Sequence, residues 1–193
     1  MDSEIIIVSG LPRSGTSLMM QMLENGGIEI ITDHQRTADA DNPRGYYEFE
    51  KVKQIKRDSS WLPGARGKAF KMVSQLLYDL PSSERYRVLF MERDLEEMLL
   101  SQEKMLQRLG RSAAPREEMI RSYTLHLERL HDWLRQQAHM QCLRVSYNDL
   151  LERSQEQAER VHDFLGGKVD IEKMARTVDP SLYRNRATRS PTQ

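Results

Sequence analysis

Short, continuous apolar runs recur along the chain, and between them apolar residues repeat every three or four positions. Continuous runs of roughly 4–8 residues that are rich in β-branched side chains are typical of strands buried in a parallel sheet. The runs that fit this description lie at residues 5–8, 28–31, 68–73, 87–91 and 142–146. We therefore expect a central, mainly parallel five-stranded sheet.

Helical periodicity fills the intervals between these runs. The longest expected helix runs from Pro115 to about residue 137, with apolar residues at spacings of three and four: Met119, Tyr123, Leu127, Leu130 and Leu134. Further helices are expected at 18–23, 50–58, 95–109 and 154–165, the last opened by a capping box of Ser154 and Gln157. Strands that alternate with helices predict an α/β domain with a parallel sheet.

The composition excludes several classes of protein. The 193 residues include 29 basic and 29 acidic side chains, so no net field draws the chain to nucleic acid or to an anionic membrane. The single cysteine, Cys142, cannot form a disulfide within the chain, which favours a reducing compartment. The acidic N-terminus does not resemble a signal peptide, and no apolar run approaches membrane-spanning length. We therefore expect a soluble, cytoplasmic protein.

A glycine-bracketed loop follows the first apolar run. Gly10 and Gly15 are separated by four residues, and Ser17 follows at the spacing of a phosphate-binding P-loop. A strand, such a loop and a helix bring backbone N–H groups and the positive end of a helix dipole to one point. Thr16 stands where a nucleoside triphosphatase has its lysine, and the nearest cation is Arg13, inside the loop. The loop therefore predicts phosphate binding without the usual γ-phosphoryl chemistry.

A second candidate site follows the fourth apolar run. Arg93 comes at the expected C-terminal end of that strand, where a side chain reaches the ligand crevice of a parallel sheet, and Ser101 lies eight positions further on. In isolation, Arg93 would be interpreted as the partner of a neighbouring acid and Ser101 as a surface residue. Glu92 and Asp94 in turn resemble a Walker-B acid, which is the feature that most favours a kinase or nucleoside triphosphatase.

The run Pro12-Arg13-Ser14-Gly15-Thr16-Ser17 resembles the 5′-phosphosulfate-binding loop of the sulfotransferase superfamily. This resemblance implies a single P-loop, three-layer α/β domain over residues 1–187, followed by a frayed tail at 188–193. It also implies the donor 3′-phosphoadenosine 5′-phosphosulfate (PAPS). The loop residues implied to bind the donor are Arg13, Ser14, Gly15, Thr16 and Ser17.

Other positions extend the resemblance to the rest of the donor site. Arg93 and Ser101 match the family's arginine and serine that hold the 3′-phosphate, and Tyr147 falls in a segment that lies near the adenine. Arg184 and Arg186 are candidates to replace the family's C-terminal phosphate-binding loop, or else they are solvated charges of the tail.

The run 68–73 resembles the Lys-Thr-His strand of the cytosolic sulfotransferases. Lys71 occupies the lysine position, which implies a catalytic role beside Arg13 in stabilising the charge of the leaving oxygen. Val73 occupies the position of the catalytic histidine, so the general base must come from elsewhere.

Two residues of the long polar segment after the second apolar run are candidates for that base. His34 falls where the tyrosylprotein sulfotransferases have a glutamate base, and its imidazole titrates near neutrality. Glu48 is the rival, because the aromatic residues beside it would raise its pKa. Asp33 is a weaker third candidate. The alternative interpretations are a solvated loop histidine for His34 and a first-turn helix acid for Glu48.

The resemblance implies transfer of a sulfuryl group from PAPS to a hydroxyl or amine of a small-molecule or peptide acceptor. No metal, nucleic acid or membrane is expected to take part, and the sequence does not indicate an oligomeric state. Two alternatives remain open. One is an ATP-dependent, kinase-like phosphotransferase on the same fold, and the other is a non-catalytic nucleotide-binding module, which Val73 favours. The remaining histidines, His126, His131, His139 and His162, are interpreted as structural or solvated.

Overall fold

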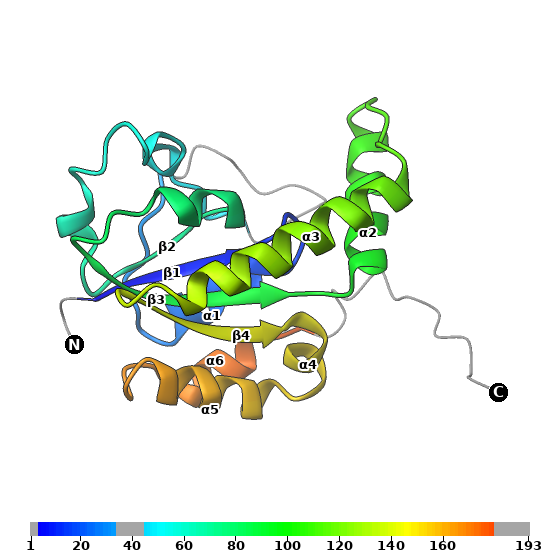
Figure 1. The fold of residues 1–193 in the computed structure, drawn as a ribbon. Helices are drawn as coiled ribbons and strands as arrows, with labels where there is room; N and C mark the ends of the chain where they lie inside the picture. The colour runs from blue at the N-terminus through cyan, green and yellow to red at the C-terminus, as the bar shows by residue number, and fades with distance from the viewer. Residues whose placement is uncertain (1–3, 34–44, 180–193) are drawn as a thin grey trace.

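A computed structural model describes residues 4–33 and 45–179 of the chain. Its centre is a four-stranded sheet in which every neighbouring pair of strands is parallel, as the apolar runs predict. The strand order is β2-β1-β3-β4 (Figure 1). The strands are β1 (Glu4–Gly10), β2 (Ala69–Lys71), β3 (Arg85–Glu92) and β4 (Met140–Ser146).

The expected fifth strand at residues 28–31 is wrong. This segment makes only an isolated parallel bridge between Ile30 and Ala69, flanked by hydrogen bonds from the Ala69 N–H to the Glu29 carbonyl and from the Ile31 N–H to the Ala69 carbonyl. β2 is itself only three residues long, so it offers too short an edge for a second ladder. The sheet therefore has four strands and not five.

Helices occupy the intervals that the periodicity indicated. The α-helices are α1 (Thr16–Asn25), α2 (Leu95–Arg108), α3 (Arg116–Arg135), α4 (Tyr147–Glu152), α5 (Ser154–Phe164) and α6 (Ile171–Thr177). The 3₁₀ helices are η1 (Glu50–Gln54), η2 (Leu62–Ala65) and η3 (Ser74–Asp79).

Two local predictions fail in detail. The helix expected over 50–58 is only the 3₁₀ helix η1. The capping box is also wrong, because Ser154 is already the first residue of α5 and the N-cap is Arg153, which makes no side-chain capping bond.

The sheet lies between two apolar layers, as expected of a three-layer domain. Alternate residues of β1 face opposite sides: Ile6 and Val8 belong to a cluster with α1, α5 and α6, whereas Ile5 and Ile7 belong to a cluster with α3 and the 3₁₀ helices. Figure 1 shows α5 and α6 on one side of the sheet and α3 on the other. Because both faces of the sheet are covered, the sequences of its central strands are continuous apolar runs.

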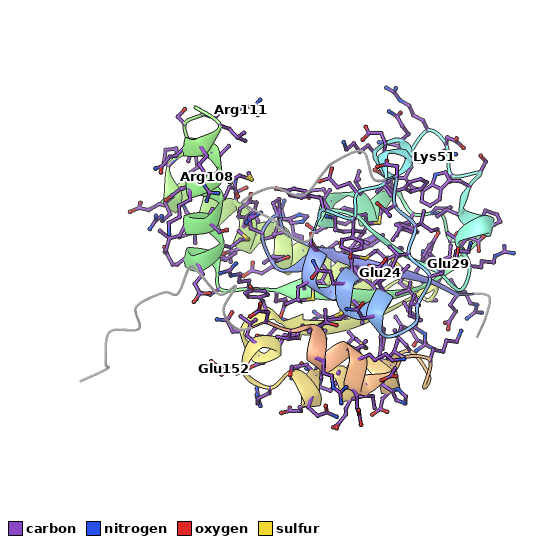
Figure 2. The ribbon with its side chains drawn as sticks, turned by 180° about the vertical axis from the view of Figure 1, so that it is seen from behind. Glu24, Glu29, Lys51, Arg108, Arg111 and Glu152 are labelled. Atoms are coloured by element: carbon purple, nitrogen blue, oxygen red, sulfur yellow. The ribbon has the colours of Figure 1, made fainter. Side chains whose placement is uncertain are left out.

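The helices α1, α2 and α4 begin directly after β1, β3 and β4, so their N-termini gather at the carboxyl edge of the sheet. In open parallel sheets this edge is where ligands bind. The far end of α2 projects from the body of the molecule, and Figure 2 shows Arg108 and Arg111 at its tip. None of the helices in the described ranges is both long and apolar enough to cross a lipid bilayer.

Candidate active site

The loop between β1 and α1 has the backbone of a phosphate cradle. Gly10 has φ of 152°, and a Cβ there would lie 2.5 Å from Ser14 Oγ and 2.6 Å from the Met91 carbonyl oxygen. The loop turns on a hydrogen bond of 3.2 Å from the Ser14 N–H to the Leu11 carbonyl. α1 then begins at Thr16 without a side-chain cap, so its first N–H groups point to the mouth of the loop.

Ser14 supplies a direct test of whether the loop fits an anion. Its side chain is buried, and within the described part of the chain its Oγ has no hydrogen-bond partner. A buried hydroxyl without a partner is costly, so a native structure normally explains it by a ligand, an ion or a water. The orphaned hydroxyl beside free helix N–H groups therefore fits a phosphate or sulfate group held in this loop.

The two predicted phosphate sites meet at Arg13. The Arg13 Nε donates a hydrogen bond of 3.1 Å to Ser101 Oγ on α2, and Ser101 is buried rather than on the surface. Arg93 Nη1 donates a hydrogen bond of 3.3 Å to the Arg13 carbonyl. Residues that are separated by 80 and 88 positions thus form one continuous group at the carboxyl edge of the sheet.

Arg93 also pairs with an acid, as its alternative interpretation proposed. Its side chain is 7% exposed, and its Nε lies 3.4 Å from an oxygen of Glu97, which is 5% exposed. The same Glu97 oxygen accepts a hydrogen bond of 3.4 Å from Asn148 Nδ2 on α4. Glu97 was missed in the sequence, although Arg93, Glu97 and Ser101 follow one another at helical spacings of four residues.

Tyr147, the first residue of α4, contacts residues of both predicted phosphate sites. The Arg93 guanidinium lies 4.5 Å from the centroid of its ring, a distance typical of a cation–π contact. On Gly15, a Cβ would lie 2.4 Å from Tyr147 Cδ2, so the ring packs directly against the loop. Burial raises the pKa of Tyr147, and the positive charge of Arg93 only partly opposes that effect. The phenol therefore stays protonated at neutral pH.

Lys71 reaches the first turn of α1 from the end of β2. Its Nζ contacts the Tyr46 backbone carbonyl and lies 3.4 Å from Ser17 Oγ. The Ser17 hydroxyl also donates to the Tyr46 carbonyl at 3.4 Å. The lysine predicted as catalytic thus lies against the loop predicted to bind phosphate. Val73, in the position of the family's histidine, is exposed.

The general-base candidates differ in what the structure says of them. The Glu48 carbonyl accepts hydrogen bonds from Thr32 Oγ1 at 2.9 Å and from the Asp33 N–H at 3.1 Å. The Asp33 carboxylate accepts one from the Glu50 N–H at 2.6 Å, which ties the two ends of the long polar segment together. The other candidate for the base, His34, lies outside the described residues. The candidates for 3′-phosphate binding in the tail, Arg184 and Arg186, also lie outside them.

The acids that resembled a Walker-B motif have structural partners. Glu92 pairs with Arg144 at 2.7 Å and with His131 at 3.1 Å. Asp94 is the N-cap of α2 and accepts a hydrogen bond of 3.1 Å from the Glu97 N–H. These contacts account for both carboxylates without a nucleotide-bound magnesium ion.

The contact between Gly15 and Tyr147 yields a prediction about stability. Gly15→Ala should lower the free energy of unfolding by about 2 kcal/mol or more, because φ at Gly15 is 99° and the new methyl would overlap the Tyr147 ring. Gly27→Ala is the matched control, since φ there is 96° but no atom lies within 4 Å of the new Cβ. Urea denaturation of both variants measures the difference. Equal destabilisation would mean that the ring does not press on the loop.

The fold and the site define a P-loop α/β protein in which Arg13 and Arg93 lie at the loop and Thr16 stands in place of a Walker lysine. The chain belongs to the sulfotransferase domain family, whose model matches residues 3–189. It is therefore a sulfotransferase, as the resemblance implied. A search of curated proteins finds no significant match.

Solved sulfotransferase structures share the fold. Mouse sulfotransferase SULT7A1, complexed with PAP, superimposes with a TM-score of 0.59 at 14% identity, over 96% of this chain and 68% of that one. The sulfotransferase domain of the curacin biosynthetic pathway has a TM-score of 0.53 at 14% identity, over 91% of this chain and 78% of that one. A sulfotransferase from Alicyclobacillus acidocaldarius has a TM-score of 0.50 at 16% identity, over 88% and 82%.

Proposed function

We propose that this sulfotransferase takes its sulfuryl group from PAPS and transfers it to a hydroxyl or amine of a small-molecule or peptide acceptor. The observation that carries the proposal is the hydrogen bond between Arg13 and Ser101, because it joins the phosphate loop to the second phosphate site. A nucleotide with phosphate at both its 5′ and its 3′ positions matches two adjacent cationic sites. The PAP bound to the mouse relative supports the same donor.

The donor's two ends are assigned to two sets of residues. The backbone N–H groups of residues 14–17 and the Ser14 hydroxyl hold the 5′-phosphosulfate. Arg93 and Ser101 hold the 3′-phosphate, with Arg184 and Arg186 as further candidates. Tyr147 lies near the adenine, and its ring packs against the Arg93 guanidinium.

The reaction is an in-line displacement at sulfur. The acceptor oxygen or nitrogen attacks, the bond between sulfur and the 5′-phosphate oxygen breaks, and the electron pair stays on that oxygen. Arg13 and Lys71 stabilise the negative charge that develops there, which is the usual task of a cation fixed before reaction. The acceptor's proton goes to a general base, for which His34 and Glu48 are the candidates from the sequence. We propose a cytoplasmic site of action.

A calorimetric titration tests the donor. Adenosine 3′,5′-bisphosphate (PAP), the product left after sulfuryl transfer, should bind with micromolar or better affinity, and ATP with magnesium should bind at least tenfold more weakly. Only a ligand with a 3′-phosphate uses Arg93 and Ser101. Equal binding of both nucleotides, or magnesium-dependent binding of ATP alone, would instead favour the kinase-like alternative. PAP binding without sulfation of any acceptor would favour the non-catalytic module.

A further inference from the structure

His126 of α3 lies close to the end of β2. It contacts the residue that follows Val73, and Val73 occupies the position of the catalytic histidine of the cytosolic sulfotransferases. The next residue, Ser74, opens η3 and is fully buried. Its Oγ lies 2.9 Å from Nε2 of His126. Ser74 follows Lys71 by three residues, so their Cα atoms are at most about 10 Å apart. Since Lys71 contacts Ser17, His126 is brought to the same edge of the sheet as the phosphate loop.

The hydrogen bonds of Ser74 determine which imidazole nitrogen carries the proton. The Ser74 hydroxyl donates to the side-chain carbonyl of Gln75, at 3.4 Å. Having used its proton there, the Ser74 oxygen accepts from His126, so Nε2 of the ring carries hydrogen. The lone pair is then on Nδ1, on the far side of the ring from Ser74. A buried partner that fixes the tautomer of a histidine is the arrangement that orients a general base.

The surroundings of His126 keep the ring neutral. Burial lowers the pKa of His126 below its ordinary value, and the electrostatic interaction with His131, further along α3, acts in the same direction. From η3 the ring of Tyr78 faces it, with centroids 6.4 Å apart. At pH 7 the imidazole is therefore unprotonated and able to accept a proton.

The helix that carries His126 also packs on the phosphate loop. Tyr123 and Leu127, which flank His126 on the inner side of α3, pack against the cluster formed by Leu11 of the loop and two residues of α2. A shift of α3 would disturb both contacts together, so the position of the imidazole relative to the loop is fixed by packing.

We propose that His126 is the general base of sulfuryl transfer and that Ser74 is its positioning residue. This inference rests on the proposed function. As the acceptor oxygen bonds to sulfur, its proton passes to Nδ1 of His126, while the sulfur–oxygen bond to the 5′-phosphate breaks and the electron pair leaves with PAP. The proton on Nδ1 is returned to solvent after product release.

The surface around the base indicates the class of acceptor. Val73 and Tyr78 precede and follow Ser74 in the chain, and they are 44% and 40% exposed. Large exposed apolar side chains next to a polar group suit a ligand with an apolar body and one reactive group. The acceptor class that fits is a hydroxyl carried on an aromatic or aliphatic skeleton, for which 2-phenylethanol is a simple probe.

The test follows the release of PAP from PAPS in the presence of 2-phenylethanol, whose hydroxyl stays protonated throughout the pH range of the assay. PAP release counts transfer to the alcohol and to water alike. His126→Gln should slow release by about 100-fold, a usual loss for a general base. PAP affinity, measured by calorimetry, should change less than twofold. His162→Gln is the matched control: it replaces a histidine of α5 whose Nδ1 lies 2.7 Å from the Val169 carbonyl, and it should leave the rate unchanged.

The pH profile separates a base from a structural histidine. As the pH is lowered below the pKa of His126, the rate of PAP release by the wild-type protein should fall tenfold per pH unit, because the protonated imidazole accepts no proton. This fall in rate at low pH, the acid limb of the profile, should be absent in His126→Gln. Ser74→Ala should retain the limb but release PAP about tenfold more slowly, since Nε2 loses the partner that fixes the tautomer.

The outcomes are distinguishable. If wild-type protein fails to bind PAP, the proposed function itself is wrong. If wild-type and His126→Gln bind PAP equally and release it from PAPS equally fast, the donor site stands and the assignment of the base is overturned. An unchanged acid limb in His126→Gln would likewise overturn it and would direct the search to Glu48 and His34.

Discussion

Replacing Lys71 with methionine is expected to slow PAP release from PAPS by 100- to 1000-fold, roughly the loss seen when a fixed donor to developing charge is removed. The Lys71 ammonium lies at the first turn of α1, next to Ser17, and it is held there by the Tyr46 carbonyl. The affinity for PAPS, measured without an acceptor, should change less than threefold, because the charge that Lys71 stabilises appears only as the bond to sulfur breaks. Single-turnover release and calorimetry measure the two quantities.

Lys68→Met is the control for this experiment. Lys68 stands just before β2, three residues from Lys71, and its Nζ pairs with Glu29 at the outer edge of the sheet. It carries the same charge as Lys71 and lies next to the same strand, but it does not contact the loop, so its replacement should change release less than twofold. Equal losses in the two variants, or a loss of PAPS affinity that matches the loss of rate in Lys71→Met, would contradict a transition-state role.

Replacing Arg93 with alanine should weaken PAP binding by about 10- to 100-fold, which corresponds to about 1.5–3 kcal/mol for a hydrogen bond between charged groups. The guanidinium is fixed over Tyr147 and bonded to the Arg13 carbonyl, so little side-chain entropy remains to be lost on binding. Calorimetric titration of the purified variant with PAP measures the change.

Arg93→Ala also leaves the Glu97 carboxylate buried without its cation, which destabilises the fold. The double variant Arg93→Ala with Glu97→Gln removes that charge and should recover stability in thermal unfolding. Its PAP affinity should stay low, because the ligand to the 3′-phosphate is still missing. Recovery of PAP affinity along with stability would show that Arg93 acts only through the ion pair.

The sequence predicted most of the strands because burial on both faces leaves a continuous apolar run. β1 and β3 follow this rule, as Ile5 and Val88 illustrate, whereas β4 lies at the edge of the sheet and has exposed residues. The run at 28–31 has the same composition but no strand ladder, since a ladder needs a partner with free edge positions, and β2 ends at Lys71. Apolar content measures burial, and it does not report whether a neighbouring edge is long enough to pair.

The sequence predicted those site residues that belong to short local motifs. Arg13, Arg93 and Ser101 were identified from spacing, and the structure brings them together. The pairing of Ser74 with His126 joins residues 52 positions apart, and neither residue has a local signature. Such a contact follows from how α3 packs against η3, which the periodicity of α3 alone does not specify.

The strand order has a consequence for how ligand binding relates to folding. The loop after β1, Lys71 of β2, Arg93 just after β3 and Tyr147 at the start of α4 come from four widely separated parts of the chain. A chain that has formed only some of these strands holds no complete nucleotide site, so the nucleotide has affinity for the finished domain alone. By mass action, PAP at 100 times its Kd should add about 2.7 kcal/mol to the free energy of unfolding. Nucleotide supply would then govern how long the folded protein survives in a cell, as well as how fast it works.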